Sequence, residues 1–178
     1  MDHVGFDSEH LSMELIHRGH AVQAIDVLSD KLLYTYIPRN PPILEDLERQ
    51  YRFWERRDSP DETEYWLNWV IFLRTTRECV GTVQIGIDKQ KREGSIAYMI
   101  GRNFQGRGYG TESVRAMLEH CQSHYGVQCF KAWIDTRNGA SIRLVQKLGM
   151  KQVEFIEKAD HFDGEDSDEY VFQLDVGG

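Results

Sequence analysis

A glycine-rich segment near the middle of the chain constrains the fold more than any other part of the sequence. An apolar run at residues 95–100 leads into Gln105-Gly-Arg-Gly-Tyr-Gly110, where every second residue is glycine, and a segment with helical spacing follows from Thr111. Glycine lets backbone N–H groups close around an anion, and the N-terminus of a helix carries partial positive charge. The pattern predicts a strand, a tight turn and a helix that together hold a diphosphate.

Known nucleotide-binding motifs do not fit this turn. The dinucleotide fingerprint G-x-G-x-x-G would need a third glycine where the chain has Thr111, and the Gly-Lys-Ser/Thr ending of the Walker A loop is absent. A glycine-rich turn without a ligand is the alternative. The coincidence of the strand, the alternating glycines and the following helix favours a diphosphate site.

The spacing of apolar residues predicts one α/β (α+β) domain over residues 1–178. Helical spacing occurs at residues 20–29, 43–57, 111–125 and 138–148. Strand patterns occur at residues 13–18, 66–74, 79–87, 95–100, 128–135, 150–157 and 169–175. We expect the last two strands to form a hairpin around an acidic loop at residues 160–168.

Composition excludes several classes of partner. The chain has 21 Lys and Arg against 29 Asp and Glu, for a net charge of −8, which disfavours a nucleic-acid partner and weakly favours a cationic one. No apolar run is long enough to span a membrane, and no secretory signal is visible. The odd number of cysteines, Cys79, Cys121 and Cys129, predicts free thiols, so we expect a cytoplasmic protein. We expect it to be either a monomer or a homodimer.

At two further points the sequence resembles a known family. Gln105, Gly108 and Gly110 fit Gln/Arg-x-x-Gly-x-Gly/Ala, the central signature of the GNAT family of acetyl-CoA-dependent N-acetyltransferases. Residues 138–150, Asn-Gly-Ala-Ser-Ile-Arg-Leu-Val-Gln-Lys-Leu-Gly-Met, resemble a second family segment, and the first half resembles the RimJ/RimL-type ribosomal-protein acetyltransferases in outline. The resemblance implies a mixed, mostly antiparallel sheet, splayed at its middle and flanked by helices on both faces.

The resemblance also implies a set of residues that bind coenzyme A. In the family the turn binds the diphosphate, which here assigns Gln105, Gly106, Arg107, Gly108, Tyr109, Gly110 and Thr111. The preceding strand carries a bulge and pairs with the pantetheine arm, which assigns Tyr98, Met99 and Ile100, with the Ile100 amide polarising the thioester carbonyl. Asn138 would contact the cofactor, although asparagine also favours a plain helix N-cap.

Two departures from the family pattern leave the proton route open. A tyrosine that reprotonates the thiolate in many members is replaced by Val145, so Ser141, one helical turn earlier, is the alternative, against a merely structural hydroxyl. The glutamate that relatives often carry is replaced by Ser95. Asp135 is one possible base, and Glu78, Glu93 or a chain of waters are others.

The acceptor side is less defined. Tyr34 and Tyr36 precede Pro38 in the half of the chain that shapes the acceptor pocket in relatives, and His161 lies in the acidic loop, so we expect these residues to contact the acceptor. His120 and His124 alone make a weak ligand pair, and no metal is expected.

The sequence predicts an acetyl-CoA-dependent N-acetyltransferase that acts by direct attack in a ternary complex. Its acceptor is a small-molecule amine or a protein N-terminus, and polyamines, aminoglycoside-like antibiotics and amino acids all stay open. The rival hypothesis is a non-catalytic acyl-CoA-binding or sensing module on the same fold.

Overall fold

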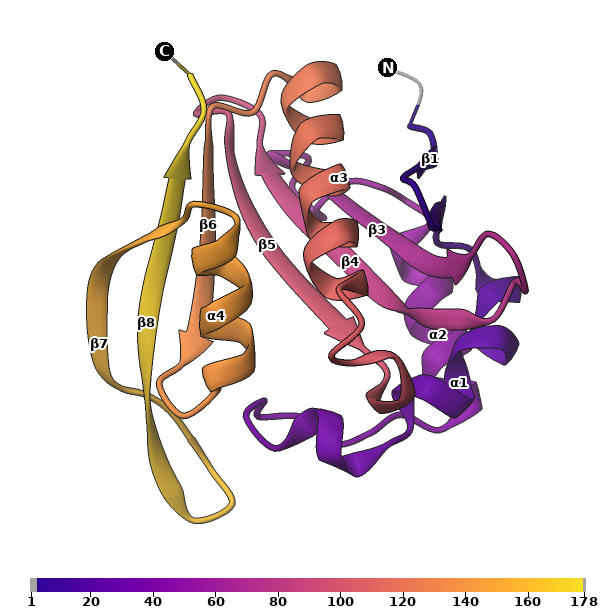
Figure 1. The fold of residues 1–178 in the computed structure, drawn as a ribbon, viewed down its shortest axis with the longest axis horizontal. Helices are drawn as coiled ribbons and strands as arrows, with labels where there is room; N and C mark the ends of the chain where they lie inside the picture. Colours follow the sequence, from indigo (N-terminus) through magenta and orange to yellow (C-terminus); the bar gives the residue numbers. More distant parts are fainter. Residues whose placement is uncertain (1–2, 178) are drawn as a thin grey trace.

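The fold is an eight-stranded sheet with helices on both faces, in a computed structural model that describes residues 3–177. The strands lie in the order β1-β2-β3-β4-β5-β6-β8-β7 (Figure 1). Their bounds are β1 Phe6–Asp7, β2 Leu11–Leu15, β3 Glu64–Leu73, β4 Cys79–Asp88, β5 Glu93–Ile100, β6 Cys129–Asp135, β7 Lys151–Phe162 and β8 Glu165–Asp175.

The helices cover both faces of the sheet and enclose one hydrophobic core on each face. Their bounds are α1 Ala21–Leu28, α2 Leu44–Trp54, α3 Tyr109–Tyr125 and α4 Gly139–Lys147, with short 3-10 helices η1 Arg18–His20, η2 Lys31–Tyr34 and η3 Arg102–Phe104. Helices α3 and α4 pack on one face around Val114, Met117 and Val145, while α1 and α2 cover the other (Figure 1). The predicted amphipathic helices are confirmed, and their apolar faces cover the two sides of the sheet.

The sheet opens at its middle, as the resemblance implied. All neighbouring strands are antiparallel except β5 and β6, which pair in parallel only from Glu93–Cys129 to Ser95–Lys131. Beyond Ser95 the two strands diverge (Figure 1). Within residues 3–177, the backbone of β5 from Ile96 to Ile100 therefore has no strand partner on that side.

Three expectations about the strands need correction. The register between β4 and β5 runs without a shift from Ile87–Gly94 to Gly81–Ile100, so the expected bulge is absent there and lies instead between β3 and β4, after Ile71. The acidic segment is not a loop, because β7 and β8 extend through it to a turn at Asp163-Gly164, whose residues have φ of 53° and 80°. The two-residue β1 has no periodicity and was not predicted.

The three cysteines are free thiols, as the sequence predicts, with Cys79 and Cys121 buried and Cys129 half-buried.

Among residues 3–177, no helix is both long enough and apolar enough to cross a membrane.

Candidate functional site

The glycine turn adopts a backbone that only glycine takes readily. Gly106 and Gly108 have φ of +74° and +87°, and a Cβ atom at either position would meet no atom within 4 Å. Glycine is needed here for conformation, because left-handed backbone is costly for other residues. Gly110 differs, since a Cβ there would lie 2.9 Å from Leu144 Cδ1, so this glycine lets α3 approach α4.

The turn presents a row of free backbone donors. Glu112 is the first residue after the turn whose backbone N–H bonds to a described residue. This N–H donates to the Gly108 carbonyl at 3.0 Å. Within residues 3–177 no acceptor takes the N–H groups of residues 106–111. These donors surround the N-terminus of α3, whose dipole adds positive potential. The geometry of the turn is therefore compatible with an anion such as a diphosphate.

The end of β5 turns further donors into the opening of the sheet. Gly101 N–H donates to the Val80 carbonyl at 2.8 Å. Hydrogen bonds alternate along an antiparallel pair, so the N–H groups of Tyr98 and Ile100 point away from β4, toward the gap beside β6. Gln105 Nε2 donates to the Ile100 carbonyl at 2.9 Å and fixes the turn against the strand. An extended ligand in the gap would meet the Ile100 amide.

The start of α4 lies on the other side of the gap. Asn138 caps the helix, with its side-chain oxygen accepting from Ser141 N–H at 3.1 Å, which leaves its amide nitrogen free to donate. The Tyr98 hydroxyl donates to the Ser141 carbonyl at 3.3 Å and ties α4 to β5. Ser141 Oγ has no partner among residues 3–177. Val145 is completely buried, so it belongs to the core.

A cavity of about 570 Å³ passes from this gap to the face covered by α1 and α2. The predicted residues that line it are Tyr34, Tyr36, Tyr98, Met99, Asp135, Asn138 and Ser141. Residues of the glycine turn do not line it, and neither does His161. The glycine turn and the cavity are thus separate regions, joined by the end of β5.

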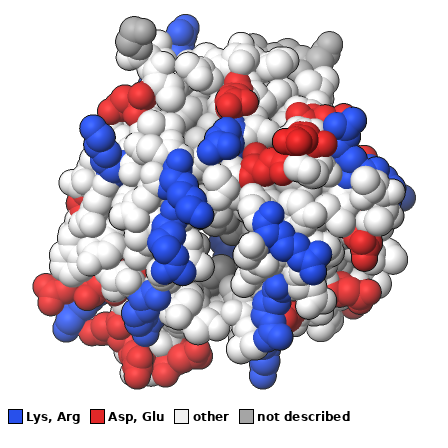
Figure 2. Space-filling view, in the orientation of Figure 1, with Lys and Arg blue, Asp and Glu red and all other residues white. Residues whose placement is uncertain are grey.

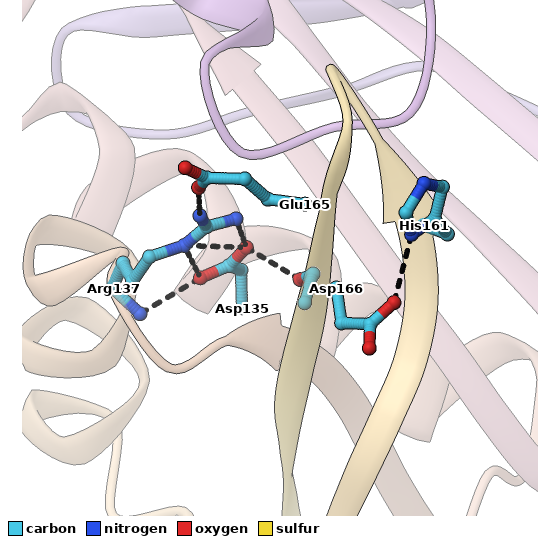
Figure 3. Close-up of polar contacts among 6 residues, drawn as sticks. Asp135, Arg137, His161, Glu165 and Asp166 are labelled. Atoms are coloured by element: carbon cyan, nitrogen blue, oxygen red, sulfur yellow. Dashed lines mark hydrogen bonds and ion pairs between the residues drawn. The ribbon is translucent and has the colours of Figure 1, made fainter.

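Asp135 is held as a structural carboxylate beside the cavity. Arg137 donates to it from Nε at 3.0 Å, from a terminal nitrogen at 2.7 Å and from its backbone at 2.8 Å, and Ser167 Oγ donates at 2.7 Å (Figure 3). Burial raises the pKa of Asp135, but these hydrogen bonds outweigh burial and lower it overall. A carboxylate with both oxygens occupied and a low pKa is poorly suited to act as a base.

Arg137 also connects the segments around the cavity mouth. Besides Asp135 it pairs with Glu165 at 3.4 Å, near the tip of the β7–β8 hairpin. Its guanidinium lies 6.0 Å from the ring centre of Tyr36 and 5.7 Å from that of Phe162. His161 instead pairs with Asp166 at 2.7 Å, apart from the Arg137 cluster (Figure 3). The expected contact between His161 and the acceptor has no support in this geometry.

Glu169 is a functional candidate that the sequence analysis missed. It sits opposite Asp135 in the β6–β8 register and lines the cavity, and its carboxylate has no hydrogen-bond partner among the described residues. Burial, together with the carboxylates of Asp160 and Asp135, raises the pKa of Glu169. The sequence pattern predicts Glu169 only as the first residue of a closing strand. The pairing of β8 with β6 is what sets this residue opposite Asp135 and beside the cavity.

Positive charge gathers where an anion would lie. Lys and Arg side chains surround a hollow on the face formed by α3 and α4 (Figure 2). Arg107, in the turn itself, is exposed, and Arg102 pairs with Asp30 at 3.2 Å. No cluster of three His, Cys, Asp or Glu side chains among residues 3–177 could hold a metal ion.

These features define a fold with an opening between two diverging strands and a turn of free backbone donors at one end of that opening. Residues 10–151 match the family model described as acetyltransferase (GNAT) domain. The chain therefore belongs to the GNAT family.

Individual relatives are distant. YkkB of Bacillus subtilis (strain 168) is 34% identical over 116 residues, which are 62% of this chain and 66% of that protein. The solved structure of RimL, a ribosomal L7/L12 alpha-N-protein acetyltransferase in complex with coenzyme A, superposes with a TM-score of 0.85 at 17% identity, covering 95% and 96% of the two chains.

A spermidine N-acetyltransferase from Vibrio cholerae, in complex with coenzyme A and spermine, gives a TM-score of 0.80 at 15% identity, covering 93% and 95% of the two chains. These two structures share the fold, but at such low identity they do not assign an acceptor.

Proposed function

We propose that the protein is an acetyl-CoA-dependent N-acetyltransferase that acts on a primary amine by direct attack in a ternary complex. The observation that carries this proposal is the opening between β5 and β6. It has free backbone donors at one end, from residues 106–111, and a cavity of about 570 Å³ at the other. Acetyl-CoA supplies the activated acyl group.

The donor side binds and polarises through backbone atoms. The open space beside Gly106 and Gly108 and the free N–H groups of the turn fit the diphosphate of coenzyme A. The Ile100 N–H, directed into the gap, donates to the acyl oxygen. A fixed donor aimed at developing negative charge stabilises the transition state without any particular side chain.

The proton route uses two side chains of the cavity. Glu169 accepts the proton of the attacking amine, because its unpartnered carboxylate and raised pKa suit a general base. Ser141 Oγ, free at the start of α4, donates to the departing thiolate. Asp135 keeps the cavity wall in place through Arg137 and Ser167.

The positions of the cysteines support direct attack. None of the three lines the cavity. Burial raises the pKa of Cys79 to about 11, which keeps it a neutral, poorly nucleophilic thiol. A covalent acyl-enzyme would therefore have no cysteine nucleophile at the cavity.

The test is release of coenzyme A from acetyl-CoA in the presence of a panel of amines and peptide N-termini. We expect release with at least one acceptor, and no transfer of labelled acetyl to the protein before the acceptor is added. Tight binding of acetyl-CoA by calorimetry, without turnover of any acceptor, would favour the non-catalytic sensing module. Prior labelling of the protein would overturn direct attack.

A further inference from the structure

The acceptor cavity is lined mainly by flat and apolar groups. Aromatic side chains come from four separate parts of the fold, namely the segment after α1, α2, β5 and β6, and prolines border the same space on the loop between α1 and α2. The set comprises Tyr34, Tyr36, Tyr51, Trp54, Tyr98, Trp133, Pro38, Pro41 and Pro42. Trp133 is 43% exposed, so its ring offers apolar surface that the protein itself leaves uncovered. Such walls bind a flat organic body well.

The carboxylates of the cavity are already committed. Three acidic residues line it, namely Asp46, Asp135 and Glu169. Asp46 pairs with Arg49, and Asp135 pairs with Arg137 at 2.7 Å. Glu169 remains, and the proposed reaction needs it to take a proton from the nucleophile. No unpaired carboxylate is left along this lining for a second positive charge.

Arg39, the basic residue of the lining, also disfavours a second positive charge in the cavity. Arg39 is exposed at the cavity, and no carboxylate among residues 3–177 pairs with it. Its guanidinium repels a second ammonium group on a bound acceptor. A buried ammonium without a partner carries a large desolvation cost, so a polyamine is poorly matched to this cavity.

We infer that the acceptor is a primary monoamine with a flat, apolar body, such as an arylalkylamine, and not a polyamine. The inference rests on the proposed function and names the acceptor class of the same site. The amine lies toward Glu169 and the β5–β6 gap, and the body lies against the aromatic walls, with Trp54 as its main contact on α2.

The test compares 2-phenylethylamine with spermidine as acceptors of the full-length protein. We expect kcat/KM for 2-phenylethylamine to exceed that for spermidine by about tenfold or more, since desolvating a second ammonium costs at least about 1.4 kcal/mol. A preference for spermidine, for other polyamines or for peptide N-termini alone would overturn the inference while leaving the transferase proposal intact. Absence of coenzyme A release with every acceptor would overturn the proposed function instead.

Two variants test the wall and the charge separately. Trp54→Ala should raise KM for 2-phenylethylamine about tenfold and leave KM for acetyl-CoA unchanged, because Trp54 lines the acceptor cavity and lies outside the glycine turn. Trp54 also packs on the core beside Tyr51, so Trp54→Phe, which keeps an aromatic ring there, is the matched variant and should raise KM for 2-phenylethylamine less. Equal effects on both substrates would show a merely structural role and overturn the assignment of Trp54.

Gln50→Glu adds an unpaired carboxylate to the half-buried rim of the cavity without changing side-chain size. It should raise kcat/KM for spermidine about threefold to fivefold relative to 2-phenylethylamine, within the range of a partly exposed ion pair, which contributes up to about 1 kcal/mol. Gln90→Glu, in the exposed turn before β5, is the matched control and should change neither value. No gain with Gln50→Glu, or the same gain with Gln90→Glu, would contradict the charge argument.

Discussion

The two ends of the opening between β5 and β6 are built in different ways. At the proposed donor end the available groups are backbone N–H groups from one continuous stretch, residues 100–111, whose conformation depends on Gly106, Gly108 and Gln105. At the acceptor end the groups are side chains brought together from α2, β5, β6, β8 and the loop after α1. The shape and charge of the donor end need few particular side chains. Those of the acceptor end depend on almost every side chain that lines the cavity.

This difference separates structural features that family members can share from the side chains that can set the acceptor of one member. A backbone cradle can be kept while most side chains change, which is consistent with a TM-score of 0.85 to RimL at 17% identity. Side chains such as Trp54 and Glu169 can be exchanged singly without altering the sheet. Changes at the donor end should therefore affect acetyl-CoA alone, and changes at the acceptor end should affect the amine or the proton route.

The largest expected effect on a Michaelis constant comes from Gly108→Val. A β-branched residue at φ +87° strains the turn by about 2 kcal/mol or displaces its N–H groups. Steady-state kinetics should show KM for acetyl-CoA raised about 30-fold or more, in line with that energy, and KM for the amine changed less than about threefold.

Gly164→Val is the matched control for Gly108→Val. Gly164 has φ +80°, and a Cβ there would also meet nothing within 4 Å, but it lies in the β7–β8 turn. It should leave KM for acetyl-CoA unchanged. If Gly108→Val raised both KM values equally, the two ends would not be separable in the way described.

A smaller effect is expected for Ser141→Ala, at the boundary between the two ends. Loss of a hydroxyl that donates to the thiolate should lower kcat about tenfold, or about 1.4 kcal/mol, with both KM values nearly unchanged. Ser123→Ala is the control, because Ser123 also lies on a helix and its hydroxyl bonds only to the Glu119 carbonyl. An unchanged kcat for Ser141→Ala would show that this hydroxyl is structural.

The donor end could be predicted from sequence because its determinants are local. Positive φ at Gly106 and Gly108, the strand before them and the helix after them all lie within one short segment. Glu169 could not be predicted, because its role depends on the β6–β8 register that sets it opposite Asp135. Asp135 lines the cavity, and only the contacts of Arg137, which the sequence does not reveal, show that its oxygens are occupied.

The smallest expected effect is a shift in pH dependence at the acceptor end. Glu169 must be ionised to accept a proton, so kcat/KM for the amine should fall as pH drops through its pKa, which burial, Asp160 and Asp135 raise. Asp160→Asn removes one of the two negative charges, lowers that pKa and should move the acidic limb down by about 0.5 pH units, as expected for one partly screened charge.

Glu169→Gln supplies the reference for that measurement. Without the carboxylate, the acidic limb assigned to Glu169 should disappear and kcat should fall about 100-fold, the range of a general base. Adding Asp160→Asn to Glu169→Gln should then produce no further shift, because the group that senses the charge is gone. An acidic limb that persists in Glu169→Gln would instead place the base elsewhere, and the acceptor end would then resemble the donor end in depending on no single carboxylate.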